Sequence, residues 1–171
     1  MRARVLATWY HLAGVAAPPE LDSALTRALA LRATLDDHHP WSLHPARTAL
    51  ILLDDCAEVD PGLLAIAVGV DSLVPEWHDA TGPAGVVPTP ATAGEELLEA
   101  LVAAPRRIRL VACAERLDHA RHLHMFEYGD APGFRAEVAS VYLPVAERTH
   151  AQVARRFERW LQASARKRRS R

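Results

Sequence analysis

The chain has 171 residues, half of them hydrophobic, and a formal net charge of −1. This length suits one domain with a proper core, and the near-neutral balance gives no general attraction to nucleic acid or membranes. No segment approaches the roughly 20 apolar residues of a membrane span, and the first residues lack the compact apolar centre of a signal peptide. Cys56 and Cys113 lie in apolar patterns typical of buried core residues in a reducing compartment, so we expect a cytoplasmic protein.

The first half of the chain is dominated by apolar residues at helical spacing. They predict helices over Arg2–Ala13, Glu20–Leu35 and Pro45–Ala57. Asp60 before a proline then predicts the N-cap of a fourth helix, Pro61–Val74. Because this helix is apolar nearly all round, we expect it at the centre of the fold.

The second half continues the helical pattern, and no segment alternates with period two over a useful length. We therefore predict an all-α, single-domain helical bundle over residues 1–165 and a basic, disordered tail over 166–171. The expected later elements are a proline-rich loop at 75–90, a helix from a Thr92–Glu95 capping box to Ala104, a helix over Arg106–Met125, a turn at 128–133, and a helix over Phe134–Ala165 that Pro144 kinks or splits.

Asp71 stands out because it lies at the end of the most apolar predicted helix. A buried ionised carboxylate is costly unless it meets a cation, a metal or several hydrogen-bond donors. Without a metal, Arg47, Arg116 or protonation of Asp71 itself could remove that cost. The alternative is that Asp71 reaches solvent or caps a turn where the helix stops.

Two further positions add groups that bind metals. His44 precedes the third helix, where a lone histidine is more often a surface or capping residue. Glu115, His119 and His122 follow one another at i, i+4 and i+7, which is either a functional stripe or a solvated face. Since His44, Asp71 and Glu115 come from three helical regions that share one core, together they would suit a divalent metal.

Four segments, in order, resemble motifs of the HD-domain metal-dependent phosphohydrolases, in particular the small alarmone hydrolases of the RelA/SpoT type. The resemblance implies an all-helical fold, a divalent Mn, Fe or Zn ion, and hydrolysis of a nucleotide such as (p)ppGpp. It also implies metal ligands at His44, Asp71 and Glu115, and substrate contacts at Trp41 and His119. The segments are Pro40–Ala49 (family PYxxHPxxVA), Leu64–Val74 (ALLHDVVED), Leu110–His119 (LLIKLADRLHN) and Val141–Glu147 (YLPLAE).

The chain departs from this family at several positions that activity should need. Val70 stands where the family has the histidine of its HD pair, and Glu115 is one methylene longer than the family's aspartate. Val74 and Pro75 occupy the positions of the catalytic acidic pair. The basic run that contacts the nucleotide is absent from residues 35–39. A lost ligand and a lost acid–base group should weaken both metal binding and catalysis.

Three hypotheses follow. In the first, the chain is a degenerate HD-domain protein without the standard hydrolase activity that acts as a binding or regulatory protein for a small nucleotide or phosphate ligand. It would then hold little metal, hydrolyse guanosine tetraphosphate slowly or not at all, and gain metal affinity from Val70→His. In the second, it is an active phosphohydrolase with a rearranged metal site that recruits His78 or His119, although His78 should lie beyond the core. In the third, it is an unrelated bundle whose tail binds nucleic acid, for which the composition offers little support.

Overall fold

The computed structural model describes residues 1–33, 35, 39, 41–74, 77–78, 86–88, 94–123 and 131–169. Within these ranges the regular structure is entirely helical and contains no strand, which confirms the all-α prediction. The helices are α1 (Arg2–Ala13), α2 (Pro19–Ala30), α3 (His44–Leu50), α4 (Pro61–Gly69), α5 (Gly94–Ala103), α6 (Arg106–His122), α7 (Ala131–Glu137), α8 (Leu143–Glu147) and α9 (Ala151–Arg169), with π-helical turns η1 (Ile51–Asp55) and η5 (Val138–Tyr142).

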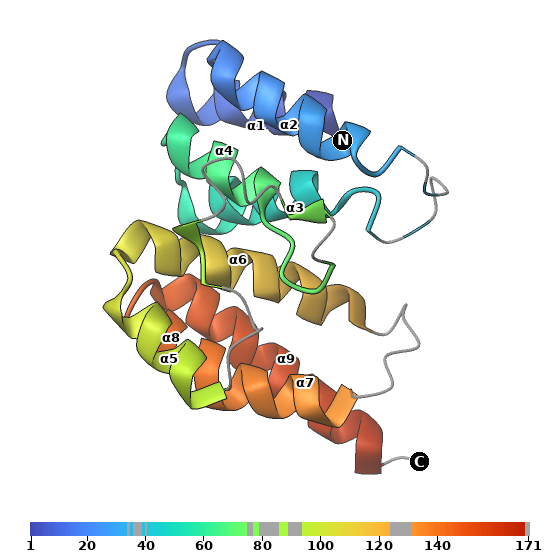
Figure 1. Cartoon of the computed structure of the whole chain (residues 1–171), viewed down its shortest axis with the longest axis vertical. Helices are drawn as coiled ribbons and strands as arrows, with labels where there is room; N and C mark the ends of the chain where they lie inside the picture. The colour runs from blue at the N-terminus through green and yellow to red at the C-terminus, as the bar shows by residue number, and fades with distance from the viewer. Residues whose placement is uncertain are drawn as a thin grey trace.

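The helices stack in layers, with α1 and α2 at one end and α7 and α9 at the other (Figure 1). Helix α6 crosses the middle and contacts α3 and α4 on one side and α8 and α9 on the other. Every side chain from Leu110 to Ala120 is consequently buried, including four that carry polar or charged groups. Charged groups enclosed in this way need partners, and those partners define the candidate site.

Helix α4 begins as predicted, because the Oδ1 atom of Asp60 accepts a hydrogen bond from the backbone N–H of Leu63 at 3.0 Å. It is apolar and packs against α2, α3 and α6. However, it ends at Gly69, short of the predicted Val74, and Val70 is already extended with φ −85° and ψ 132°. The predicted end at Val74 was therefore wrong, although α4 is buried against three helices as expected, and α6 also crosses the middle of the molecule.

Three other predicted helices differ in their ends. The second ends at Ala30, five residues early, and the third passes into the π-helical turn η1. The last predicted helix is interrupted at 148–150, where the backbone N–H of Thr149 donates a hydrogen bond to the carbonyl of Ala146. Pro144 lies in the first turn of α8, where its missing N–H costs no helical hydrogen bond.

Several sequence predictions lie outside the described residues, namely most of the proline-rich loop, the Thr92 cap and positions 128–130. The turn predicted for 131–133 is wrong, because α7 already begins at Ala131. Helix α9 runs on to Arg169, so the expected boundary at 165 falls within a helix. Cys113 is buried and Cys56 is half-buried, and both are free thiols.

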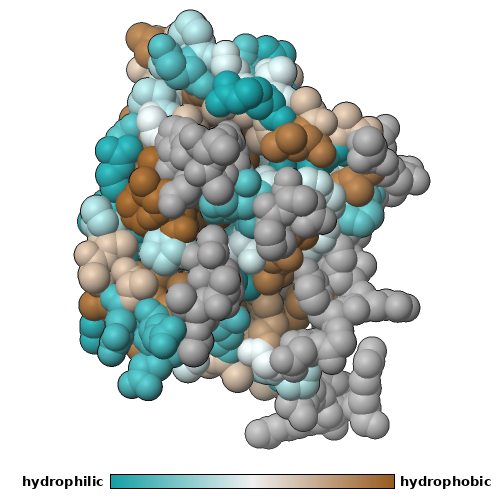
Figure 2. All heavy atoms as spheres, viewed as in Figure 1, coloured by the Kyte–Doolittle hydropathy of each residue, from teal (hydrophilic) through white to brown (hydrophobic). Residues whose placement is uncertain are grey.

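The surface in Figure 2 mixes hydrophobic and hydrophilic residues in small groups. Among the described residues, no helix has both the length and the apolar character needed to cross a bilayer.

Candidate metal centre

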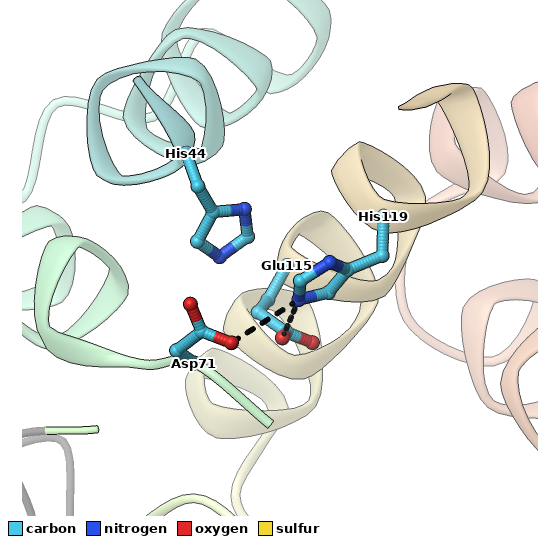
Figure 3. A group of neighbouring side chains, drawn as sticks. All are labelled: His44, Asp71, Glu115 and His119. Carbon is cyan, nitrogen blue, oxygen red and sulfur yellow. Dashed lines mark ion pairs between the residues drawn. The ribbon is translucent and has the colours of Figure 1, made fainter. Parts of the chain in front are cut away.

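Four buried side chains converge between α3, α4 and α6 (Figure 3). His44 comes from the start of α3, Asp71 follows the end of α4, and Glu115 and His119 lie one turn apart on α6. Each residue is at most 1% exposed, and one ligand atom from each lies within 4.8 Å of the others. The structure thus brings together His44, Asp71 and Glu115, the three candidate ligands from sequence, with His119, the replacement ligand of the second hypothesis.

Glu115 links the segment that follows α4 to helix α6 through hydrogen bonds. Its Oε1 atom accepts hydrogen bonds from the backbone N–H of Ser72 at 2.9 Å and from the Ser72 hydroxyl at 2.6 Å. The same oxygen lies 2.7 Å from Nε2 of His119, as the i,i+4 spacing allows. The polar side of α6 predicted from sequence is therefore buried at Glu115 and His119, and it is not a solvated face there.

Asp71 is held by a buried arginine and by a tight turn. Its Oδ2 atom accepts a hydrogen bond from Arg32 at 2.8 Å, and both side chains are inaccessible to solvent. Its Oδ1 atom accepts hydrogen bonds from the backbone N–H groups of Leu73 at 3.3 Å and Val74 at 3.0 Å, and lies 3.6 Å from His119 Nε2. These local bonds compete with helical bonding and explain why α4 stops before Asp71.

The two arginines considered from sequence as partners of Asp71 bind elsewhere. Arg47 donates from Nε and Nη2 to the two oxygens of Asp118, at 2.8 and 2.9 Å. Arg116 donates to the Tyr142 hydroxyl at 3.1 Å and pairs with Glu137. Their assignment to Asp71 was wrong because helical spacing alone does not say which face of α3 or α6 meets the end of α4.

Asp118 was not among the site residues predicted from sequence, although it lies only one turn from Glu115. Its Oδ2 atom lies 2.8 Å from Nδ1 of His44, and both groups are buried. An ionised carboxylate only accepts hydrogen bonds, so Nδ1 of His44 donates and Nε2 is the nitrogen left for a further interaction. Among the described residues this Nε2 atom has no hydrogen-bond partner, and it points toward Asp71 in Figure 3.

Trp41 packs against the two histidines of the cluster. Its ring centroid lies 4.3 Å from that of His119 and 5.8 Å from that of His44, both edge to face. The two imidazoles stack on each other at 4.4 Å. Trp41 is therefore a wall of the cluster and restricts how both histidines can turn.

The other residues considered as replacement ligands lie outside the cluster. His78 is half-buried, and its Nδ1 atom lies 3.4 Å from the backbone N–H of Asp71. The Nδ1 atom of His122 lies 2.8 Å from the backbone carbonyl oxygen of Asp118 and 3.2 Å from its Oδ1 atom. Val70 is buried among apolar residues.

The buried acids are ionised. Burial raises the pKa of Glu115, but the charge and hydrogen bond of His119 outweigh it and hold the pKa well below its usual range. Burial likewise opposes ionisation of Asp118, yet hydrogen bonds from His122, His44 and Arg47 hold its pKa low. Burial would lower the pKa of His119, but Glu115 and Asp71 raise it above its usual value.

The described acidic and basic groups around the site are equal in number. The three carboxylates of Asp71, Glu115 and Asp118 face Arg32, Arg47 and His119, whose pKa is raised by Glu115 and Asp71. A divalent cation among the four ligand atoms would take the place of the His119 proton, because a metal binds the neutral imidazole. Two imidazoles and two carboxylates suit Zn²⁺, Mn²⁺ or Fe²⁺, so the residues present fit such an ion.

The chain was compared with protein-family models, curated proteins and solved structures, and none of them matches it.

Proposed function

We propose that the chain is a metal-dependent phosphohydrolase of HD-domain type with a rearranged metal site. His44, Asp71, Glu115 and His119 would hold one divalent ion of the Mn²⁺, Fe²⁺ or Zn²⁺ kind. The substrate class, a nucleotide or another small phosphorylated molecule, comes from the sequence resemblance.

The observation that carries this proposal is the pair formed by Asp118 and His44. A histidine that ligates a metal typically donates its other N–H to a carboxylate, which fixes the ring and its tautomer. Here the carboxylate is present, and the remaining nitrogen is buried with no hydrogen-bond partner among the described residues. Leaving that nitrogen bare costs free energy that a metal ligand bond would recover.

A fourth candidate ligand favours the hypothesis of a rearranged metal site over that of an inactive protein. The hypothesis of an inactive protein counted three ligands, because Val70 replaces a histidine of the family. His119 approaches the same acids from α6 and supplies a second imidazole. When bound, the ion would act as a Lewis acid toward a phosphoryl group and activate water. The residues around it would fix the ligand geometry, and Trp41 would limit the space above the histidines.

Metal analysis and titration test the site. The protein is depleted with a chelator and titrated with Mn²⁺ and Zn²⁺ by calorimetry. We expect one site per chain in the unmodified protein and at least a tenfold weaker site in His119→Ala. The control is His11→Ala, which removes an exposed histidine of α1 outside the cluster. Absence of saturable binding, or equal binding by the two variants, would refute the assignment of His119.

Activity is tested on the same preparations. Release of phosphate or pyrophosphate is measured from guanosine tetraphosphate, nucleoside triphosphates and p-nitrophenyl phosphate, with Mn²⁺ or with chelator. We expect metal-dependent release from at least one of these compounds, and loss of that release in Glu115→Gln. A protein that binds metal stoichiometrically but releases nothing from any of them would be a binding protein instead.

The buried ion pair of Arg32 with Asp71 favours a second candidate, a metal-free regulatory protein. In this case Arg32 supplies the positive charge that a metal would otherwise provide. Arg32→Met should then destabilise the fold by about 3–5 kcal/mol whether or not metal is present, because a buried carboxylate loses its partner. If the metal site is real, Mn²⁺ should restore much of that loss. Arg27→Met, at an exposed position of α2, is the control.

A further inference from the structure

A second polar site lies on the other side of Asp118 from the metal-centre cluster. A cavity of about 480 Å³ opens between α1, α3, η1, α6 and α9. Among the described residues, none of the four candidate metal ligands lines it. Asp118 forms part of its wall, together with Arg47.

The lining of this cavity combines positive charge with an apolar strip. Its described residues include four arginines and three aspartates, which leave an excess of one positive charge before His122 is considered. Leu50 and Ile51 provide the apolar strip. A volume in this range suits a small organic ligand, for which charged groups fix orientation and apolar side chains supply contact area.

One carboxylate holds two of these arginines side by side. Asp55 accepts a hydrogen bond from Arg121 at 3.0 Å on Oδ2 and from Arg156 at 2.6 Å on Oδ1. Each bond uses one of the five N–H donors of its guanidinium, so further donors remain for a second anion. The Nε atom of Arg156 is buried and has no hydrogen-bond partner among the described residues.

This pairing positions two guanidinium groups that come from different helices, α6 and α9. Planar guanidinium groups bind phosphate oxygens in a bidentate manner, and two of them on one phosphate give both affinity and direction. A neutral ligand would leave the excess positive charge of the cavity unbalanced. The cavity therefore favours an anion with a small apolar part.

We propose that this cavity binds a small phosphorylated molecule, with its phosphate group on Arg121 and Arg156 and its organic part against Leu50 and Ile51. The site is separate from the candidate metal centre. It can therefore be tested in the presence of a chelator, so that its failure does not depend on the metal proposal.

The test is calorimetric titration of the full chain, in chelator and low salt, with inorganic phosphate and with AMP as a phosphate monoester. We expect saturable binding of AMP, weaker binding of inorganic phosphate, and at least a tenfold loss of AMP affinity in Arg121→Ala and in Arg156→Ala. Arg155→Ala is the matched control, because Arg155 lies on the same helix, is exposed, and within the described part of the chain hydrogen-bonds Gln152 and no residue of the cavity.

Asp54→Asn separates a binding role from a structural one. Removing this exposed carboxylate makes the cavity more positive, leaves the Asp55 bridge between the two arginines in place, and should tighten AMP binding about threefold or more. Circular dichroism confirms that each variant is folded. No saturable binding by the unmodified chain, equal losses in Arg155→Ala and Arg156→Ala, or weaker binding in a folded Asp54→Asn would each overturn the proposal. Equal affinity for inorganic phosphate and AMP would remove the role of Leu50 and Ile51.

Discussion

At the scale of single residues, Asp118 fixes the orientation of the His44 ring through the hydrogen bond from its Nδ1 atom. The carboxylate lies between His44, which belongs to the candidate metal centre, and Arg47, which lines the cavity proposed to bind a phosphorylated molecule. It is therefore shared by both candidate sites. A change at this position should alter the orientation of His44 without removing any ligand.

We expect Asp118→Asn to weaken divalent metal binding by about 10- to 100-fold, in line with the loss of other carboxylates that support ligating histidines. The amide has nearly the same shape, but it is neutral and holds the His44 N–H less firmly. Calorimetric titration with Mn²⁺ measures the effect. Asp54→Asn, at an exposed position of η1, is the control and should leave the affinity unchanged.

At the scale of helices, the N-terminal end of α4 contributes to stability and its C-terminal end positions Asp71. The N-terminal end is closed by its Asp60 cap. The C-terminal end stops early because Asp71 bonds the following backbone, which frees the carboxylate to face α6. A helix continued to Val74 would have kept this backbone in helical bonds instead.

Removal of the cap should therefore lower stability without touching the cluster. We expect Asp60→Ala to reduce the free energy of unfolding by about 1 kcal/mol, because the N–H of Leu63 loses its partner. Asp60→Asn, which can still accept that bond, should cost only a few tenths of that value. Chemical denaturation measures both variants, and equal losses for the two would contradict a capping role.

At the scale of the whole molecule, the charged interior makes stability depend on pH. The pKa of His119 is raised above 6.5 in the fold, so its contribution is fully present below pH 6.5 and is lost as pH rises through the folded value. The pKa values of Glu115 and Asp118 are lowered from 4.5 and 3.8, so their contributions are present above those values and are lost as pH falls.

The metal-free protein should therefore be most stable between about pH 4.5 and pH 6.5 and should lose stability on both sides. Thermal unfolding from pH 3 to pH 9 measures this profile. His119→Gln should remove the decline on the alkaline side, whereas His11→Gln, at an exposed position of α1, should not. A profile of the unmodified protein that rises steadily from pH 6 to pH 8 would contradict the assignment.

Local sequence patterns were sufficient for the helical class, for the Asp60 cap and for the choice of His44, Asp71 and Glu115 as a set. Apolar spacing, a capping residue next to a proline, and costly polar residues in apolar segments are properties of neighbouring residues. They can be recognised without knowing how the helices pack. They also left open whether Asp71 faced solvent, a turn or a cation.

Only the tertiary structure decided the partners. Arg32 and Asp71 are 39 positions apart, and His44 and Asp118 are 74 apart, so no helical or turn spacing links them. Their pairing depends on the rotation of α3, α4 and α6 about their axes, which packing of the whole core determines. The same packing put α6, despite its charged residues, in the middle of the molecule, since these charges neutralise one another only when the helices are assembled.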